Sequence, residues 1–587
     1  MTINTETALN HASELLAGWT RESANPEPHR LDLSVAAGDL LDCARALAEN
    51  HWGYLAAITG MDHGSQEESG AELEALYHFC SGRAVLTLRV QLPYIKAIVP
   101  SVCPYFPYAS LYERELMEMF GILVSNTPNP ERLFLPDDWP VGVYPLRKAF
   151  NPAEMPAPRT SARALEAAEG SEPPSLLHLD EDAEHPPERF IVPIGPQHPA
   201  LKEPGHFEFM VDGETVIDAS VRLGYVHRGI EKATEERNWV QNLYLLERVC
   251  GICSHTHAMA YCLAVEQLAG VEVPQRAQAI REVMAGLERI HSHLLWLGVS
   301  AHEAGFDTLF MYSWRDRETV MDLLEGISGN RVNYSANVLG GVKCDLGPEQ
   351  IEAIRKGLDF LEKRSHHYLD IVTSDAAFLQ RTRGIGVMSA GQAEQWGVLG
   401  PTARASGIIR DIRIEAPYGA YVRFPVTAVT DSAGDLEARF KVRIKELFVS
   451  YHVIRTILDQ LPDGDLAVRM PRKIPAGESI SRVEAPRGEL LYYVRSGGGE
   501  KPERIKARTP SITNFTSVSN LVVGHQLADV PLILAGIDPC FSCNDRMVSL
   551  KKAGGGRESW SWQQLRQHAI DHYKDLKPKW PGKRILG

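Results

Sequence analysis

The sequence predicts an α+β domain that a linker joins to a second, mainly α-helical domain with peripheral β structure. The first of three observations is length, because 587 residues are more than one compact domain usually contains. The second is a change from mixed strand-like and helix-like patterns to sustained helical spacing from about residue 232. The third is a proline-rich, acidic stretch at residues 151–188, which has the composition of a linker.

The N-terminal domain is expected to span residues 1–150. Residues 39–49, DLLDCARALAE, have the apolar spacing of an amphipathic helix. Residues 75–79 and 84–92, ALYHF and AVLTLRVQL, have the composition of strands. These patterns together predict an α+β domain.

The second domain is expected to span residues 189–546. It opens with strand-like segments at 190–198 and 206–221, and the second of these turns at Asp212-Gly213, a dipeptide that favours hairpins. Helical spacing then recurs in five segments, at residues 260–270, 279–305, 318–328, 348–380 and 435–460. Residues 547–587 remain as a C-terminal tail that contains one amphipathic helical pattern.

Composition and charge exclude several classes of protein. Hydrophobic residues make up 44% and charged residues 23% of the chain, as in soluble globular proteins. The formal charge of −14 gives no electrostatic basis for binding nucleic acid. The sequence also lacks a secretory signal and any run of about 20 apolar residues. We therefore expect a cytoplasmic protein whose membrane contact runs through partner subunits.

Four of the nine cysteines form two C-x-x-C pairs, Cys250/Cys253 and Cys540/Cys543. Spacing i to i+3 puts both sulfurs of a pair on one face of a turn, and soft thiolates select zinc, iron–sulfur clusters or other thiophilic metals. A structural zinc site is one interpretation, but the pairs lie 287 positions apart, whereas zinc ribbons draw their pairs from within about 20 residues. A thioredoxin-like dithiol would explain only one pair.

The sequence around these cysteines resembles a known family. RVCGIC and DPCFSC resemble the two nickel-ligand motifs of [NiFe]-hydrogenase large subunits, and the resemblance continues through GPQHPALKEP, GYVHRGIEK, VLGPTARASGIIRDIR and EAPRGELLYYV. YASLYERELMEMFGI and LFLPDDWPVGVYPLRKAF resemble the 30-kDa subunit of respiratory complex I, whose 49-kDa subunit shares GPQHP and GYVHRGIEK but lacks the four cysteines. The whole chain is similar to group 4, energy-converting hydrogenase large subunits of the formate hydrogenlyase and hydrogenase-4 type.

This resemblance implies a catalytic subunit that interconverts protons plus electrons and H2, with H2 evolution as the expected direction. The alternative is a non-metallated, complex I-like subunit with a quinone-docking or structural role in an NADH-quinone oxidoreductase-type complex. Two histidines match positions of the quinone pocket in those relatives, His198 and His227. The electron donor, whether formate, carbon monoxide or ferredoxin, is not set by this chain.

The resemblance also implies roles for individual residues. Cys250 and Cys540 would be terminal nickel ligands, while Cys253 and Cys543 would bridge nickel to an iron that carries carbon monoxide and cyanide. Cys540 is the expected base that takes the proton from H2. Glu203 is the expected proton relay, and the competing interpretation is an acid in a surface turn.

Four further residues are expected around the metals. His257, four residues after Cys253, would hydrogen-bond a bridging sulfur, unless it is an ordinary core histidine. Arg487 would lie over the metals with Pro486 and Asp538 as companions, and Asp538 is the expected ion-pair partner of Arg487. A purely structural role before Pro539 is the alternative for Asp538.

The remaining expectations concern cofactors and partners. No G-x-G-x-x-G follows a strand, so no flavin or NAD site is expected, and no further cysteine cluster exists for an iron–sulfur centre. The family implies a small subunit with a proximal [4Fe-4S] cluster, other iron–sulfur and integral membrane subunits, nickel-insertion factors and a maturation protease. That protease would cut after Arg546, with a retained, packed tail as the alternative. The resemblance places the complex peripherally on the inner face of the cytoplasmic membrane.

Overall fold

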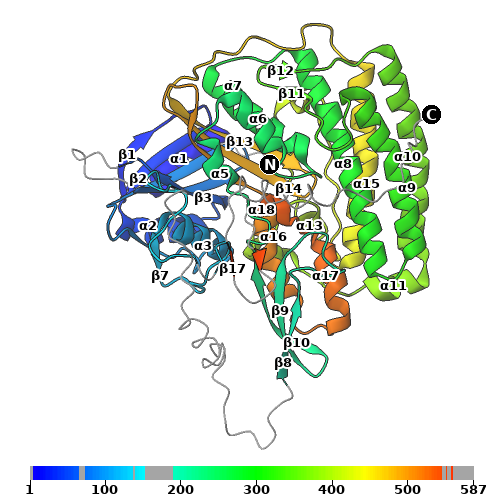
Figure 1. Cartoon of the computed structure of the whole chain (residues 1–587), viewed down its shortest axis with the longest axis horizontal. Helices are drawn as coiled ribbons and strands as arrows, with labels where there is room; N and C mark the ends of the chain where they lie inside the picture. The colour runs from blue at the N-terminus through cyan, green and yellow to red at the C-terminus, as the bar shows by residue number, and fades with distance from the viewer. Residues whose placement is uncertain are drawn as a thin grey trace, which may run out of the picture.

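The computed structural model describes residues 4–64, 73–136, 139–151, 189–544, 550–551 and 557–558. In this part of the chain, an N-terminal sheet domain lies beside a helical bundle, and a smaller sheet lies between the two (Figure 1). The predicted α+β domain and mainly helical domain are therefore confirmed. The expected linker from residue 152 onward, Arg546 and the helical pattern of the tail lie outside the described residues.

The N-terminal domain is built on a five-stranded sheet with the order β1-β2-β5-β4-β3, in which only the β2–β5 pair is parallel. Its strands are β1 (Thr20–Ala24), β2 (Arg30–Val35), β3 (Tyr54–Asp62), β4 (Leu73–Ser81) and β5 (Ala84–Leu92). The helices of this part are α1 (Thr5–Leu15), α2 (Leu40–Glu49) and α3 (Ala109–Phe120), accompanied by η1 (Ala37–Asp39), β6 (Ile98–Pro100) and β7 (Leu123–Ser125). The predicted helix and strands thus form at the predicted positions.

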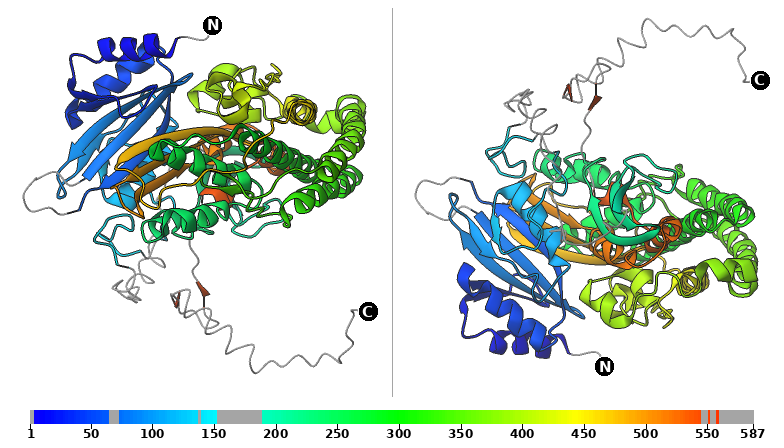
Figure 2. Two further views of the ribbon diagram at one scale, coloured as in Figure 1. Left: turned by 90° about the horizontal axis from the view of Figure 1, so that it is seen from above. Right: turned by 90° about the horizontal axis from the view of Figure 1, so that it is seen from below.

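Strands β2, β3, β4 and β5 of this sheet are buried on both faces along most of their length, whereas the edge strand β1 is mostly exposed. Along β4, Tyr77 and Phe79 join the core under α1 and α2, whereas Leu76 and Cys80 point to the opposite face, as the period-2 geometry of a strand requires. Figure 2 shows α1 and α2 on the side of the sheet away from the helical bundle. The other face is free to meet the second domain.

The second domain begins with a three-stranded antiparallel sheet of β8 (Arg189–Ile194), β9 (His206–Asp212) and β10 (Thr215–Arg222). The predicted hairpin is confirmed, since β9 pairs with β10 from Asp212 to Thr215. Gly213 has φ +60° in that turn, a conformation that suits glycine. The loop between β8 and β9 contains the LKEP segment.

A bundle of four long helices forms the body of the second domain: α8 (Gln275–Glu303), α9 (Asp307–Ser328), α10 (Pro348–Ser374) and α15 (Leu436–Asp459). Helix α8 is buried along most of its length, because it packs on α9, α15 and α17. Its neighbours before the bundle are α5 (Ile230–Thr234), α6 (Trp239–Glu247) and α7 (Ser254–Ala269). The predicted helices at 279–305, 318–328 and 435–460 are confirmed.

Shorter elements complete the domain. They are β11 (Asn337–Val338), β12 (Gly341–Val342), α11 (Ala376–Thr382), α12 (Ala390–Gln395), α13 (Gly400–Arg404), α14 (Ile412–Glu415), η3 (Gly419–Val422), α16 (Pro510–Leu521), η4 (Leu527–Asp529), α17 (Val530–Ile537), α18 (Phe541–Asn544), β16 (Leu550–Lys551) and β17 (Arg557–Glu558). Among the described residues, none of the helices combines the length and the apolar character that crossing a bilayer requires.

The small central sheet joins the two domains. Its antiparallel strands are β13 (Gly477–Ala485), β14 (Gly488–Ser496) and β15 (Pro502–Arg508). Tyr492 and Val494 pack with α7, while Leu491 and Tyr493 pack on the N-terminal sheet. Because both faces are buried, the LLYYV run of β14 is apolar throughout.

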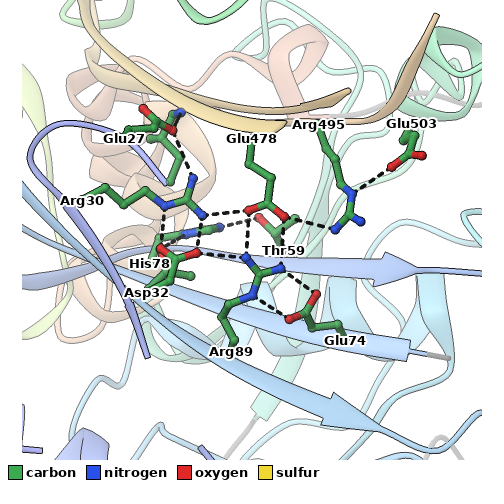
Figure 3. A network of polar contacts seen from close by, with 12 residues as sticks. Glu27, Arg30, Asp32, Thr59, Glu74, His78, Arg89, Glu478, Arg495 and Glu503 are labelled. Carbon is green, nitrogen blue, oxygen red and sulfur yellow. Dashed lines mark hydrogen bonds and ion pairs between the residues drawn. The ribbon is translucent and has the colours of Figure 1, made fainter. Parts of the chain in front are cut away.

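Ion pairs reinforce the same interface (Figure 3). Arg89 of β5 binds Glu74 at 2.8 Å, Asp32 at 3.0 Å and Glu478 of β13 at 2.9 Å. Arg30 binds Asp32 at 2.7 Å and Glu478 at 3.0 Å. Burial opposes ionisation of Glu478, but the Arg89, Arg30 and Arg495 charges lower its pKa to about 2. The two domains therefore share a buried network of charges.

Candidate metal centre

The two cysteine pairs meet inside the second domain, near the start of α7 and the C-terminal end of the described chain (Figure 1). The sulfurs of Cys250 and Cys540 lie 3.5 Å apart, as do those of Cys253 and Cys543. Within the second pair, the Cys540 and Cys543 sulfurs are 3.2 Å apart. All four side chains are buried, with at most 4% of any residue exposed. The structure thus brings together residues that the sequence separates by 287 positions.

The four thiols of this cluster differ in their acidity. Hydrogen bonds from the Cys253, Cys540 and Cys543 thiols hold the pKa of Cys250 well below its usual range. The pKa values of the other three thiols are raised, chiefly by their contact with Cys250 and also by burial. Four sulfurs at these separations fit a centre of soft, thiophilic metal, which would replace the shared protons.

The first pair is held by the start of α7. Cys253 immediately precedes this helix, and His257 lies one turn further along. His257 Nε2 lies 3.7 Å from the Cys543 sulfur, and its Nδ1 is 2.8 Å from the Tyr492 hydroxyl. The helix therefore carries both a cysteine and the predicted histidine to the sulfur cluster, and the contact is with the second cysteine pair.

The second pair follows α17, which ends at Asp538. Asp538 has φ +60°, a left-handed conformation that aspartate tolerates better than most residues and that turns the chain into Pro539 and Cys540. The Cys540 amide then donates to the Ser511 hydroxyl of α16 at 3.2 Å. This turn aims both sulfurs of the second pair at the first.

Arg487 reaches the cluster from the tight turn between β13 and β14. Its guanidinium donates to the Asp538 carboxylate at 2.9 Å and to the Asp538 carbonyl at 3.0 Å, so the expected pair is present. Pro486 is the other, buried residue of this turn. Gly400 permits the approach, because a Cβ there would lie 2.2 Å from the Arg487 carbonyl oxygen.

Asp538 is an ionised carboxylate at the centre of this arrangement. Burial disfavours its charge, but Arg487 and Lys202 outweigh that effect and lower its pKa to about 2. The Lys202 ammonium lies 3.0 Å from the same carboxylate. The thiols and Asp538 together raise the pKa of the Arg487 guanidinium well above its usual range.

Glu203 lies against the second cysteine motif. Its carboxylate accepts hydrogen bonds from the Ser542 amide at 2.8 Å and from the Ser542 hydroxyl. Gly205, two residues on, packs so closely on the Phe541 ring that a Cβ would lie 2.0 Å from it. Glu203 is thus anchored to the residue between Cys540 and Cys543.

The two histidines that the sequence suggested for a quinone pocket, His198 and His227, lie in different parts of the second domain. His198 is in the loop between β8 and β9, where its Nδ1 accepts from the Ala200 amide at 3.2 Å. His227 precedes α5 and lines a cavity of about 50 Å³, which Cys543, Glu231 and Lys506 also line. Of these two histidines, His227 is the one that shares a cavity with a cysteine of the cluster.

Comparisons with known families agree with this geometry. The family model described as "Respiratory-chain NADH dehydrogenase, 30 Kd subunit" matches residues 33–156. The 49 Kd subunit model of the same complex matches residues 303–474 and 466–546. The "Nickel-dependent hydrogenase" model matches residues 228–299, which contain the first cysteine pair.

Individual relatives extend over the whole chain. Formate hydrogenlyase subunit 5 of Escherichia coli is 34% identical over 96% of this chain and 97% of its own length. Hydrogenase-4 component G of the same organism is 32% identical over 97% of this chain and 99% of its own length. The chain belongs to the group 4 [NiFe]-hydrogenase large-subunit family. It is a hydrogenase, fused to a complex I 30-kDa-like domain.

A solved structure shares the fold of this hydrogenase. A chain of the membrane-bound sulfane sulfur reductase, an archaeal respiratory membrane complex, is 33% identical and superposes with a TM-score of 0.58. The match covers 60% of the present chain and 97% of the other. The shared fold extends to a complex whose printed name describes a different reaction.

Sequence reasoning missed several residues of this hydrogenase site. Lys202 adjoins the predicted Glu203, yet its ion pair with Asp538 joins two segments that are distant in sequence. Tyr492, Ser511 and Glu288 were also missed, because their roles depend on packing between elements. The only available clue was the position of Lys202 inside the recognised LKEP segment.

Proposed function

We propose that Cys250, Cys253, Cys540 and Cys543 hold the nickel–iron centre at which this chain interconverts H2 with protons and electrons. The observation that carries the proposal is the convergence of four buried sulfurs within 3.2–3.5 Å of their neighbours. The close Cys250–Cys540 pair supports the expected terminal nickel ligands. The close Cys253–Cys543 pair supports the expected bridging ligands, and the iron would carry carbon monoxide and cyanide.

When bound, the metal pair would supply the Lewis acidity for the reaction, and would accept electrons when H2 is cleaved and donate them when H2 is formed. The chain supplies the path for protons. The Cys540 sulfur holds the proton first, and Glu203 receives it, because Ser542 ties the Glu203 carboxylate to the same motif. Glu203 is only partly buried, so it can pass a proton toward solvent.

Arg487 and His257 complete the proposed site. Arg487 places a buried positive charge beside four sulfurs, and its pairing with Asp538 fixes its direction. The His257 ring, oriented by Tyr492, donates to the Cys543 sulfur and limits that sulfur's basicity. Both residues are buried, so water does not weaken the interactions of the Arg487 charge and of the His257 hydrogen bond with the site.

The alternative function is a non-metallated, quinone-docking subunit. It would use His198 and His227 but would give no role to four buried sulfurs or to Arg487 and Asp538 around them. A zinc-only site would likewise leave Glu203 and Arg487 without a task. We therefore propose the hydrogenase centre over both.

The remaining assignments belong to the same proposal. We assign residues 1–150 to the 30-kDa-like domain, 151–188 to a linker, 189–546 to the catalytic domain and 547–587 to a tail removed after Arg546. Electrons would arrive from a proximal [4Fe-4S] cluster in a small subunit within a membrane-bound complex on the inner face of the cytoplasmic membrane. H2 evolution is the proposed direction, and nickel-insertion factors and a protease would mature the chain. Intact-mass measurement of the nickel-loaded protein tests the cleavage.

The metal ligands are tested by Cys540→Ser in the purified complex. We expect this variant to lose nickel and the exchange of D2 with solvent protons, because one sulfur of the centre is gone. Cys262→Ser is the matched control, since Cys262 is a buried cysteine of α7 whose sulfur contacts the Val338 carbonyl instead. Retained nickel and exchange in Cys540→Ser, or zinc without nickel in the wild type, contradicts the proposal.

A further inference from the structure

Three residues on one face of α8 contact different chain segments of the metal centre. Glu288, Ser292 and Trp296 follow one another at intervals of four, so they line one stripe of the helix. Ser292 accepts from Arg487 at 3.4 Å, and the Trp296 indole donates to the Ala535 carbonyl of α17 at 2.7 Å. Glu288 contacts the start of α7. Helix α8 thus contacts the turn that carries Arg487 and the chain segments beside both cysteine motifs.

Cys253 occupies a position at which helices normally need a different kind of residue. It is the N-cap of α7, and N-caps are commonly Ser, Thr, Asp or Asn because their side-chain oxygen accepts from the first helical amides. Within the described structure, the Cys253 side chain makes no such hydrogen bond, and its sulfur lies 3.5 Å from Cys543. The first amides of α7 therefore need another acceptor.

Glu288 supplies that acceptor from the neighbouring helix. Its carboxylate accepts from the His255 amide at 2.7 Å, from the Thr256 amide at 3.0 Å and from the Thr256 hydroxyl at 2.5 Å. Both printed contacts of the Ser254 hydroxyl are with acceptors, the Val332 carbonyl at 2.6 Å and the Glu288 carboxylate at 3.5 Å. Glu288 is fully buried, so these bonds are shielded from water.

We propose that Glu288 is a positioning residue of the metal centre, which caps α7 from α8 and thereby leaves the Cys253 sulfur free for metal. A serine at position 253 would cap its own helix but would give up a ligand. A cysteine there holds metal, and the buried carboxylate of another helix satisfies the amides. The inference rests on the proposed function, because it assigns the Cys253 sulfur to the metal.

The next residue of α8 supports the same arrangement. Arg289 donates to the carbonyls of Glu484 at 2.5 Å and Ala485 at 3.2 Å, the two residues that precede the Pro486-Arg487 turn. Glu288 and Arg289 therefore fix two sides of the centre from adjacent positions. Loss of Glu288 should loosen the α7 side alone, since the Arg289 contacts stay in place.

The first experiment compares Glu288→Ala and Glu288→Gln with Glu282→Gln in the full chain. Glu282 is the matched control, as another fully buried glutamate of α8 that lines a different pocket with Tyr418 and Gly419. We expect nickel affinity to fall about 10- to 100-fold in Glu288→Ala, as on loss of other groups that orient metal ligands, and less in Glu288→Gln. Glu282→Gln should bind nickel as the wild type does. Unchanged nickel affinity in both Glu288 variants overturns the inference.

The second experiment measures the hydrogen bonds from the first amides of α7 to Glu288 in the metal-free chain. Peptide-level hydrogen exchange should show faster exchange of the His255 and Thr256 amides in Glu288→Ala, with the rest of α7 as protected as before. If Glu288→Ala does not fold, Glu288→Gln carries the test, because the two amides bind different carboxylate oxygens and one of these becomes an NH2 group that cannot accept. Wild-type protection of these amides in the variant that folds overturns the inference.

A rescue variant separates capping from general packing. Adding Cys253→Ser to Glu288→Ala should restore protection of the first-turn amides, because serine caps its own helix, while nickel affinity is not restored, because a proposed ligand is removed. No restoration would show that the loss came from packing and would overturn the inference. Failure of the proposed function is recognised separately, as absence of nickel from the wild-type complex.

Discussion

Asp538 serves the metal centre in three ways at once. Its left-handed backbone ends α17, its carbonyl accepts from Arg487, and its carboxylate binds both Arg487 and Lys202. One buried cation, Arg487, and one partly buried cation, Lys202, therefore depend on one anion. The Lys202 contact also brings the LKEP loop, and with it Glu203, to the second cysteine motif.

We expect Asp538→Asn to destabilise the protein by about 3–5 kcal/mol, because it leaves the buried Arg487 and the partly buried Lys202 without a counter-charge. Denaturant-induced unfolding measures the change. The control is Asp359→Asn, whose carboxylate is 72% exposed in its pair with Arg455 and should change stability by less than about 1 kcal/mol. Similar small effects of both variants would contradict the prediction.

The pH dependence of the same carboxylate has a definite sign. The pKa of Asp538 is lowered from 3.8 to about 2 in the folded chain, chiefly by Arg487 acting against burial. Its contribution to stability is therefore fully present above pH 3.8 and is lost as the pH falls through 2. The difference in unfolding free energy between wild type and Asp538→Asn should shrink over that interval, as acid titration of both proteins can measure.

Single residues mark the limit of what the sequence predicts about this site. Cys250, Cys540, Arg487 and Asp538 follow from resemblance, and the structure brings them together. Glu288 does not, because a glutamate within a helical pattern is ordinarily read as exposed, and nothing local indicates that it faces another helix. Burial between distant segments, rather than residue type, decides its role.

At the scale of elements, local patterns predicted those whose sequence alternates between apolar and polar residues or contains a distinctive turn. The hairpin of β9 and β10 followed from Asp212-Gly213, and β5 formed at residues 84–92 as expected. The run ELLYYV in β14 was assigned no element, because both of its faces are buried and the run shows no alternation. Its place between two domains arises from long-range pairing that no local pattern contains.

Helix α8 carries a second buried carboxyl, at Glu282, whose burial outweighs the Tyr421 hydrogen bond and raises its pKa to about 8. The folded chain then keeps a proton that the unfolded chain releases above pH 4.5, so stability falls as the pH rises toward 8. We expect Glu282→Gln to remove this dependence, by an amount on the order of 3–5 kcal/mol between pH 5 and pH 9. Unfolding curves of both proteins at the two pH values test it, and parallel changes would count against it.

At the scale of the whole molecule, the two domains are joined through the central sheet. Apolar residues of β14 face each domain in alternation, and the charge network of Figure 3 lies beside them. The N-terminal sheet thus packs on the strand pair whose turn carries Arg487. The fused 30-kDa-like domain is in this way part of the frame that holds the metal centre, although its own residues lie outside the sulfur cluster.

Arg89 is the central cation of that interface, because it binds Glu74, Asp32 and Glu478 from both domains. We expect Arg89→Met to destabilise the protein by about 3–5 kcal/mol, since three acidic side chains lose a shared partner in a largely buried place. Arg45→Met is the matched control: Arg45 pairs with Asp42 on the surface of the same domain, 46% exposed, and its loss should change stability by less than about 1 kcal/mol. Because the Arg89 contacts lie away from the cysteines, nickel per folded chain should stay unchanged, and its loss would mean that the interface also governs the geometry of the centre.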